Sequence, residues 1–140
     1  MNPSEQKTIV RMIGIGGVEN LEVAQLPSEQ PVSGMVRVRH LAIGVNFIDI
    51  YHRTGLYPLS LPAILGVEGA GVVEALGDDV SGFSIGDRVA YAGAPAGAYT
   101  TARSLPVSRL IKLPDGIEFR SAAASMLKGL TAHMLLTRTY

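Results

Sequence analysis

Cysteine is absent from the 140-residue sequence, which excludes disulfides, thiolate nucleophiles and every zinc site that requires cysteine. No stretch approaches the roughly 18 unbroken apolar residues of a membrane-spanning helix, so no membrane partner is expected. An excess of one charge is also missing, because 12 Lys and Arg balance 12 Asp and Glu. Because the chain has no excess of basic residues to neutralise phosphate groups, nucleic acid is not expected as a partner. The polar N-terminus, residues 1–7, lacks a signal-peptide pattern, and the expected location is cytoplasmic.

Apolar residues make up 47% of the sequence and charged residues only 17%, so the chain is expected to fold around a core. Gly and Pro, 16 and 8 residues respectively, separate short apolar stretches that indicate strands. The alternation of Val36 and Val38 with Arg37 and Arg39 is typical of a half-buried strand. Strands are predicted over residues 8–13, 21–26, 35–40, 69–76, 88–91, 99–102 and 110–113. The predicted fold is mainly β, a partly open β-barrel with short helices.

The C-terminal part, residues 118–140, has a helical pattern. Leu127, Leu130, Met134 and Leu135 form an apolar stripe on this helical tail, which is expected to pack on another element. Little chain remains to supply that partner. The 140 residues are therefore expected to be part of a longer protein.

Several chemistries lack the residue patterns that they need. There is no His-Glu-x-x-His, and His40, His52 and His133 have no carboxylate cluster at ligand spacing, so no metal site is predicted. Residues 82–86, Gly-Phe-Ser-Ile-Gly, do have the Gly-x-Ser-x-Gly spacing, but they lie in a turn-like stretch, and polar loop residues are a better interpretation than a serine nucleophile. The glycines of residues 66–71 stand in the reverse order from the dinucleotide fingerprint and precede a strand. A tight turn is the better interpretation of that segment.

Residues 46–57 are the segment richest in polar and aromatic side chains, and a short helix is expected to start after Asn46. Helix N-termini beside rigid β structure often hold ligands. A purely structural interpretation is also open at this point. In that case Asn46 is a cap, Asp49 and Arg53 form a pair four residues apart on the helix, and Tyr51 belongs to the core.

Six motifs follow one another along the chain: Ala42–Tyr51, Gly55–Pro58, Leu65–Val73, Gly86–Tyr91, Gly97–Tyr99 and Ala122–Thr131. In this order they resemble the zinc-independent quinone oxidoreductases, the zeta-crystallin-like branch of the medium-chain dehydrogenase/reductase superfamily. The resemblance covers residues 9–140, and ordered motifs over that length are a specific signal.

The resemblance implies a GroES-like catalytic domain over residues 1–123. Residues 124–140 would begin a Rossmann-type nucleotide-binding domain, the rest of which lies beyond this chain. It also implies an NADPH-dependent oxidoreductase that transfers hydride from the nicotinamide to a quinone or a related enone. Such enzymes are commonly cytoplasmic homodimers. The expected cofactor is NADPH, with most of its contacts outside this chain.

By the same resemblance, the zinc-dependent relatives carry a cysteine ligand where this chain has Asn46. They carry Gly-His-Glu where it has Gly66, Val67 and Glu68. The resemblance therefore implies catalysis without a metal ion. Hydrogen-bond donors would polarise the substrate in place of a Lewis acid.

The resemblance also assigns roles to individual residues. Asn46 and Asp49 are the expected catalytic residues, Asn46 by orienting the nicotinamide carboxamide or the substrate oxygen, and Asp49 by holding the helix or relaying a proton. Tyr57 would line the substrate entrance, and Lys128 would border the nicotinamide. The expected cofactor-binding residues are Asn46, Phe47, Ile48, Asp49, Ile50, Tyr51 and Thr131.

The Gly-rich unit that grips the pyrophosphate in this family would lie beyond Tyr140. The 140 residues by themselves are therefore expected to bind NADPH poorly and to be inactive. A stand-alone GroES-like binding or structural module without catalysis is the alternative hypothesis. A non-enzymatic accumulation role like that of crystallins also remains open.

Overall fold

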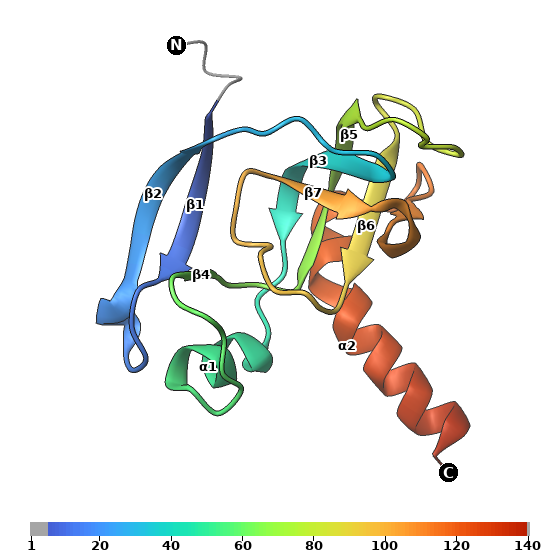
Figure 1. Cartoon of the computed structure of the whole chain (residues 1–140). Coiled ribbons are helices and arrows are strands. Elements are labelled where there is room, and N and C mark those ends of the chain that lie inside the picture. The colour runs from blue at the N-terminus through green and yellow to red at the C-terminus, as the bar shows by residue number, and fades with distance from the viewer. Residues whose placement is uncertain (1–5, 140) are drawn as a thin grey trace.

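The structure is a computed structural model that describes residues 6–139 (Figure 1). This range holds two antiparallel sheets and two α-helices. The smaller sheet, in the order β2-β1-β4, consists of β1 (Gln6–Met12), β2 (Leu21–Pro27) and β4 (Ala63–Ile64). The larger sheet, in the order β7-β3-β5-β6-β8, consists of β3 (Met35–Ile43), β5 (Glu68–Leu76), β6 (Arg88–Ala92), β7 (Ala102–Pro106) and β8 (Ile111–Lys112). The helices are α1 (Phe47–Thr54) and α2 (Phe119–Arg138), with 3-10 turns η2 (Val18–Asn20) and η3 (Val107–Arg109).

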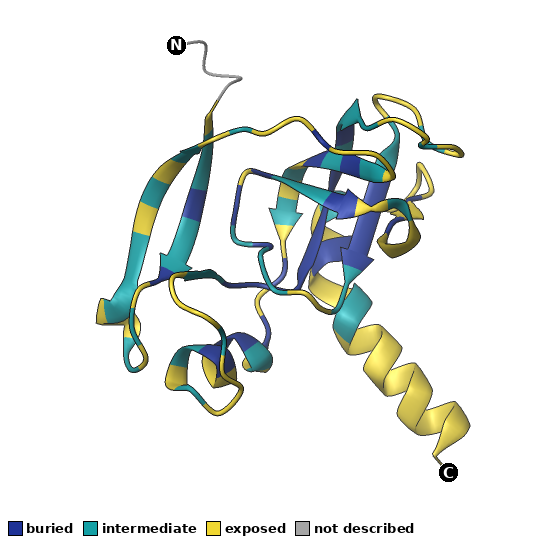
Figure 2. Ribbon diagram, in the orientation of Figure 1, coloured by how far each residue is buried: buried dark blue, intermediate teal, exposed yellow. Residues whose placement is uncertain are grey.

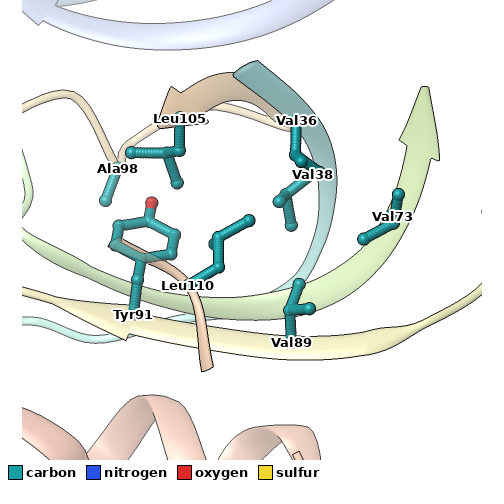
Figure 3. Packing of buried hydrophobic residues seen from close by; sticks show 8 residues of the cluster. All are labelled: Val36, Val38, Val73, Val89, Tyr91, Ala98, Leu105 and Leu110. Atoms are coloured by element: carbon teal, nitrogen blue, oxygen red, sulfur yellow. The ribbon is translucent and has the colours of Figure 1, made fainter. Parts of the chain in front are cut away.

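The larger sheet curves around a hydrophobic core (Figure 3). Val36 and Val38 point into this core from β3 and are fully buried, as the alternation in the sequence predicts. The other buried members of the cluster come from β5, β6, β7 and the connecting loops: Val73, Val89, Tyr91, Ala98, Leu105 and Leu110. This core holds β3 and β5 in place, and the ends of these two strands carry the site described below.

The two sheets meet beside β1, where the chain approaches β7. Ile9 of β1 forms an isolated β-bridge with Thr100. The Val10 N–H donates to the Tyr99 carbonyl at 2.8 Å. Over residues 6–139 the sheets do not close into a complete barrel. The predicted mainly β, partly open barrel is therefore confirmed.

One predicted strand is wrong. Residues 99–102 do not form a strand, because β7 begins only at Ala102, where its pairing with Arg39 of β3 starts. Just before it the chain turns tightly, with the Thr100 N–H donating to the Ala98 carbonyl at 2.7 Å. This segment bridges the two sheets, which its local sequence does not reveal. The other predicted strands are confirmed, with ends that differ by a few residues.

Helix α2 has two halves with different surroundings (Figure 2). Its N-terminal half packs on β3, β5 and β6, where Ala122 and Ala123 join a second buried cluster. The C-terminal half extends away from the sheets, and Leu130 and Met134 are each 53% exposed. The helix itself is confirmed, whereas of its apolar stripe only Leu127 is partly buried, and Leu130, Met134 and Leu135 are exposed. None of the helices within residues 6–139 is long and apolar enough to cross a membrane.

Candidate active site at the start of helix α1

Helix α1 begins at the end of β3 because Asn46 adopts an extended backbone and serves as its N-cap. The Asp49 carboxylate reaches back one turn, and its Oδ2 accepts the Asn46 N–H at 2.9 Å. Gly55 ends the helix in the left-handed conformation, with φ of 83°, which suits glycine. These local features fix where Asn46 lies relative to the sheet. The predicted short helix after Asn46 is thus confirmed.

Asp49 is buried and connects α1 to the segment that bridges the two sheets. Its Oδ2 accepts a second hydrogen bond, from the Tyr99 hydroxyl at 2.8 Å. Its Oδ1 is also buried and has no hydrogen-bond partner among the described residues. Burial, together with the hydrogen bond and negative charge of Asp49, raises the pKa of Tyr99 well above its ordinary value. Tyr99 therefore acts as a stable donor to this carboxylate.

Asn46 is buried, and both ends of its side-chain amide are occupied. Nδ2 donates to Glu68 Oε2 at 2.8 Å, and Oδ1 accepts from Lys128 Nζ at 2.8 Å. Lys128 Nζ also lies 3.4 Å from Glu68 Oε2. The three side chains come from the α1 N-cap, from β5 and from α2. They form a closed polar cluster, which we call the Asn46–Glu68–Lys128 cluster.

Glu68 is fully buried and also fastens α2 to the sheet. Its Oε1 accepts the backbone N–H of Leu127, within α2, at 2.6 Å. Gly44 permits this close approach, because a Cβ there would lie 2.2 Å from the Ala123 carbonyl oxygen. A hollow of about 320 Å³ opens beside the cluster, lined by residues including Gly44, Val45 and Lys128. The cluster therefore lies next to open space.

The aromatic residues predicted for the site gather on the exposed side of α1. Phe47 is 74% exposed, and its ring centroid lies 6.4 Å from that of Tyr51. Tyr51 is 37% exposed, and Tyr57 meets it edge to face at 5.6 Å. These exposures rule out the interpretation of Tyr51 as a core residue. The three rings are therefore available to a flat ligand at the exposed side of α1.

The remaining predicted site residues are placed less centrally. Ile48 is half-buried and Ile50 is exposed on α1. Thr131 lies on the exposed half of α2, and its hydroxyl donates to the Leu127 carbonyl at 2.9 Å. The helix pair of Asp49 with Arg53 does not form. Arg53 instead donates to the Gly16 carbonyl, while Asp49 faces Tyr99.

Three residues of the site were missed or undervalued from the sequence. Glu68 and Tyr99 lie within the motifs that carry the family resemblance, but the resemblance gives neither of them a role. For Lys128 it implies only a place at the border of the nicotinamide. The one signal in the sequence for Glu68 is a carboxylate within the otherwise apolar stretch of residues 61–73, because buried charges need partners. Nothing local marks Tyr99 or Lys128, because their partners are distant along the chain.

The family profile described as "Alcohol dehydrogenase GroES-like domain" matches residues 32–115. Among relatives, the chain is 52% identical over 132 residues to a protein named quinone oxidoreductase from Pseudomonas aeruginosa. The match covers 94% of this chain and 41% of that protein. A 2-haloacrylate reductase from a Burkholderia species is 41% identical over 131 residues, covering 89% of this chain and 39% of the relative.

Among solved structures, the chain superposes on the quinone oxidoreductase of Escherichia coli, a complex with NADPH, with a TM-score of 0.92. The two are 42% identical, and the match covers 95% of this chain and 41% of the other. The chain thus spans about two-fifths of the length of the relatives and structures that it matches.

Proposed function

The chain belongs to the alcohol dehydrogenase GroES-like domain family, and on that premise we propose that it is the N-terminal catalytic part of an NADPH-dependent quinone oxidoreductase. The observation that carries the proposal is the position of Asn46. Its amide is held at the start of α1 between a carboxylate and an ammonium group, and the Lys128 that supplies the ammonium borders a hollow, while the exposed rings of Phe47 and Tyr51 lie on the same helix. Its similarity to a quinone oxidoreductase and to a 2-haloacrylate reductase supports a reductase of quinones or of related electron-poor alkenes.

The proposed reaction is independent of zinc because the donor set does not fit that ion. Asn46 offers a neutral amide, and Val67 is apolar and buried. Glu68, the one carboxylate of the cluster, already contacts Asn46, Leu127 and Lys128. Zinc sites in proteins use thiolate, imidazole and carboxylate ligands, usually three or four together. Residues 6–139 contain no group of three such side chains placed to hold a metal ion.

The residues at the start of α1 do fit a nicotinamide. Beyond its contacts with Glu68 and Lys128, the Asn46 amide keeps a second N–H and a second carbonyl lone pair, which can meet the acceptor and the donor of a carboxamide. The exposed rings of Phe47, Tyr51 and Tyr57 offer faces and edges for stacking. NADPH, when bound, supplies the hydride. We assign Asn46, Phe47, Ile48, Asp49, Ile50, Tyr51 and Thr131 to its binding.

The chain's own residues orient the reactants and shield them from water. Asn46 directs its amide to the nicotinamide carboxamide or to the substrate oxygen. Tyr57, half exposed beside Tyr51, lines the substrate entrance. Asp49 holds the backbone of Asn46 through its Oδ2, which supports a positioning role within the catalytic pair. Hydrogen bonding of this kind suffices for a quinone, since such an acceptor is already electron-poor.

We propose residues 1–123 as the catalytic domain and residues 124–140 as the start of the nucleotide-binding domain. Helix α2 crosses that boundary, with its first half on the sheets and its second half exposed. The proposed homodimer and cytoplasmic location rest on the family resemblance. The isolated 140 residues should bind NADPH weakly, because they span only about two-fifths of the length of the relatives that they match.

The test uses the protein expressed from its complete reading frame. NADPH oxidation is followed at 340 nm with a small quinone as acceptor, and Asn46→Ala is compared with the natural sequence. We expect Asn46→Ala to lower kcat/KM about 100-fold, as expected when a positioning contact at the reacting groups is lost. Gln30→Ala is the control, since it removes an amide from an exposed loop and should leave turnover unchanged.

Each outcome separates the hypotheses. Turnover that depends on Asn46 supports the reductase. Turnover that Asn46→Ala leaves untouched contradicts the proposed site. Absence of turnover with both NADPH and NADH favours the stand-alone module or the accumulation role.

A further inference from the structure

We propose that Lys128, together with Glu68, is a positioning residue that locks the side-chain amide of Asn46 in one orientation. The inference deepens the proposed function and rests on it for its catalytic consequence. Its structural part concerns the Asn46–Glu68–Lys128 cluster and can be tested without any activity.

An asparagine amide has two ends of similar shape, so its neighbours decide which way it points. Glu68 Oε2 is a carboxylate oxygen, which accepts hydrogen bonds and therefore requires the Nδ2 end of Asn46, 2.8 Å away. Lys128 Nζ has only donors and therefore requires the Oδ1 end, also at 2.8 Å. The two contacts are consistent with one orientation. A flipped amide would place oxygen against carboxylate and NH₂ against ammonium.

The cluster also explains how a fully buried carboxylate is tolerated. Glu68 is 0% exposed, and a buried charge is costly unless it is paired and hydrogen-bonded. Its partners are the Asn46 amide, the Leu127 N–H at 2.6 Å and the Lys128 ammonium at 3.4 Å. Lys128 supplies the only positive charge among these three groups. Removing it would leave the carboxylate paired through neutral donors.

Lys128 differs from the other two members in being reachable from solvent. Its side chain is 53% exposed and borders the hollow of about 320 Å³ next to Gly44 and Val45. Substitution there should therefore disturb the amide more than the fold. Because Lys128 lies on α2, the orientation of Asn46 also depends on that helix keeping its place on the sheet.

The first measurement is made on the 140-residue chain by ¹⁵N nuclear magnetic resonance of side-chain amides. The Asn46 signals are assigned by their loss in Asn46→Ala. In Lys128→Met, we expect the Asn46 NH₂ protons to exchange with water about tenfold faster, as expected for the loss of one charge-assisted hydrogen bond. Lys128→Arg keeps a charged donor and should restore most of the protection. Lys112→Met is the control, because it removes a lysine from β8, and it should leave the exchange rate of the Asn46 NH₂ protons unchanged.

The second measurement is steady-state kinetics of the complete reading frame with NADPH and a quinone. We expect Lys128→Met to lower kcat about 10- to 100-fold, with a smaller change in KM and with partial recovery in Lys128→Arg. Circular dichroism should show the same fold for all variants.

The two measurements distinguish the positioning role of Lys128 from the proposed reductase function. Unchanged amide exchange in Lys128→Met overturns the positioning role, whatever the enzyme does. If exchange accelerates but kcat stays constant in an active enzyme, the role in catalysis is overturned. If the natural sequence shows no turnover while exchange accelerates, the positioning of Asn46 stands and the proposed function fails.

Discussion

Tyr99 and Asp49 lie 50 residues apart in the sequence, yet the tyrosine hydroxyl donates to Asp49 Oδ2 at 2.8 Å. The same oxygen accepts the Asn46 N–H at the start of α1. Tyr99 belongs to the segment that bridges the two sheets, because its carbonyl accepts the Val10 N–H. One carboxylate thus ties the candidate active site to the junction of the sheets.

Replacing Tyr99 with Phe should destabilise the protein without changing its fold. The variant leaves the buried Asp49 carboxylate with one donor fewer, and hydrogen bonds to charged groups contribute about 1.5–3 kcal/mol. We expect the free energy of unfolding to fall by about 2 kcal/mol in urea denaturation. Tyr57→Phe is the matched control, because Tyr57 is 50% exposed and the change should cost less than about 0.5 kcal/mol. Equal stability of the two variants would contradict the contact.

His40 gives the protein a predictable sensitivity to acid. Its Nδ1 lies 2.7 Å from the Thr100 carbonyl, so Nδ1 carries the proton of the neutral ring. Nε2 then accepts from the Tyr91 hydroxyl at 2.9 Å. Burial is the main reason that the pKa of His40 is lowered to about 4. The hydrogen bond to Thr100 raises this pKa by a smaller amount, and the positive charge of Arg103 lowers it further.

The sign of the effect on stability follows from the direction of this shift. Between about pH 6.5 and pH 4, His40 is protonated in the unfolded chain but stays neutral in the folded chain. The free energy of unfolding therefore declines as the pH falls through this range. At about 1.4 kcal/mol for each pH unit, the loss from this group approaches about 3 kcal/mol. Urea denaturation of the natural sequence and of His40→Gln at pH 7, 5.5 and 4.5 measures it. The pH dependence should be smaller in the variant, and an NMR titration of His40 with a midpoint near 6.5 would refute the burial argument.

Much of the fold follows from local patterns in the sequence. The alternation in β3 placed Val36 and Val38 in the core, and both are fully buried. Asn46 predicted the start of α1 correctly, because a cap acts on neighbouring backbone groups. The strand predicted at residues 99–102 does not form, because that segment instead contacts β1 of the other sheet. Its conformation is decided by residues far away in the sequence.

The site could be predicted only as far as it is local. Asn46, Asp49 and Tyr51 lie within one and a half turns of one helix, and the resemblance identified them together. The contact of Asn46 with Lys128 spans 82 residues and depends on how α2 packs on β3 and β5. The Asp49–Arg53 pair of the purely structural interpretation does not form for the same reason, because tertiary partners replace a helix pair that contributes only a few tenths of a kcal/mol.

Two glycines, Gly44 just before α1 and Gly129 within α2, should respond in opposite ways to substitution by alanine. At Gly44 an added Cβ would lie 2.2 Å from the Ala123 carbonyl oxygen and 2.3 Å from Glu68 Oε2. Neither atom can yield without moving α2 or the buried carboxylate. We therefore expect Gly44→Ala to lower the free energy of unfolding by about 2–3 kcal/mol, in the upper part of the roughly 1–3 kcal/mol typical of overpacked sites.

Gly129 is the matched control, because it lies within α2 and has no heavy atom within 4 Å of an added Cβ. Alanine is favoured over glycine inside a helix, so Gly129→Ala should raise the free energy of unfolding by about 0.5–1 kcal/mol. Urea denaturation of both variants measures the difference. If Gly44→Ala were also stabilising, α2 could not lie against the end of β3 as described. The contacts of Glu68 and Lys128 with Asn46 depend on that packing, so the positioning of the amide would fail with it.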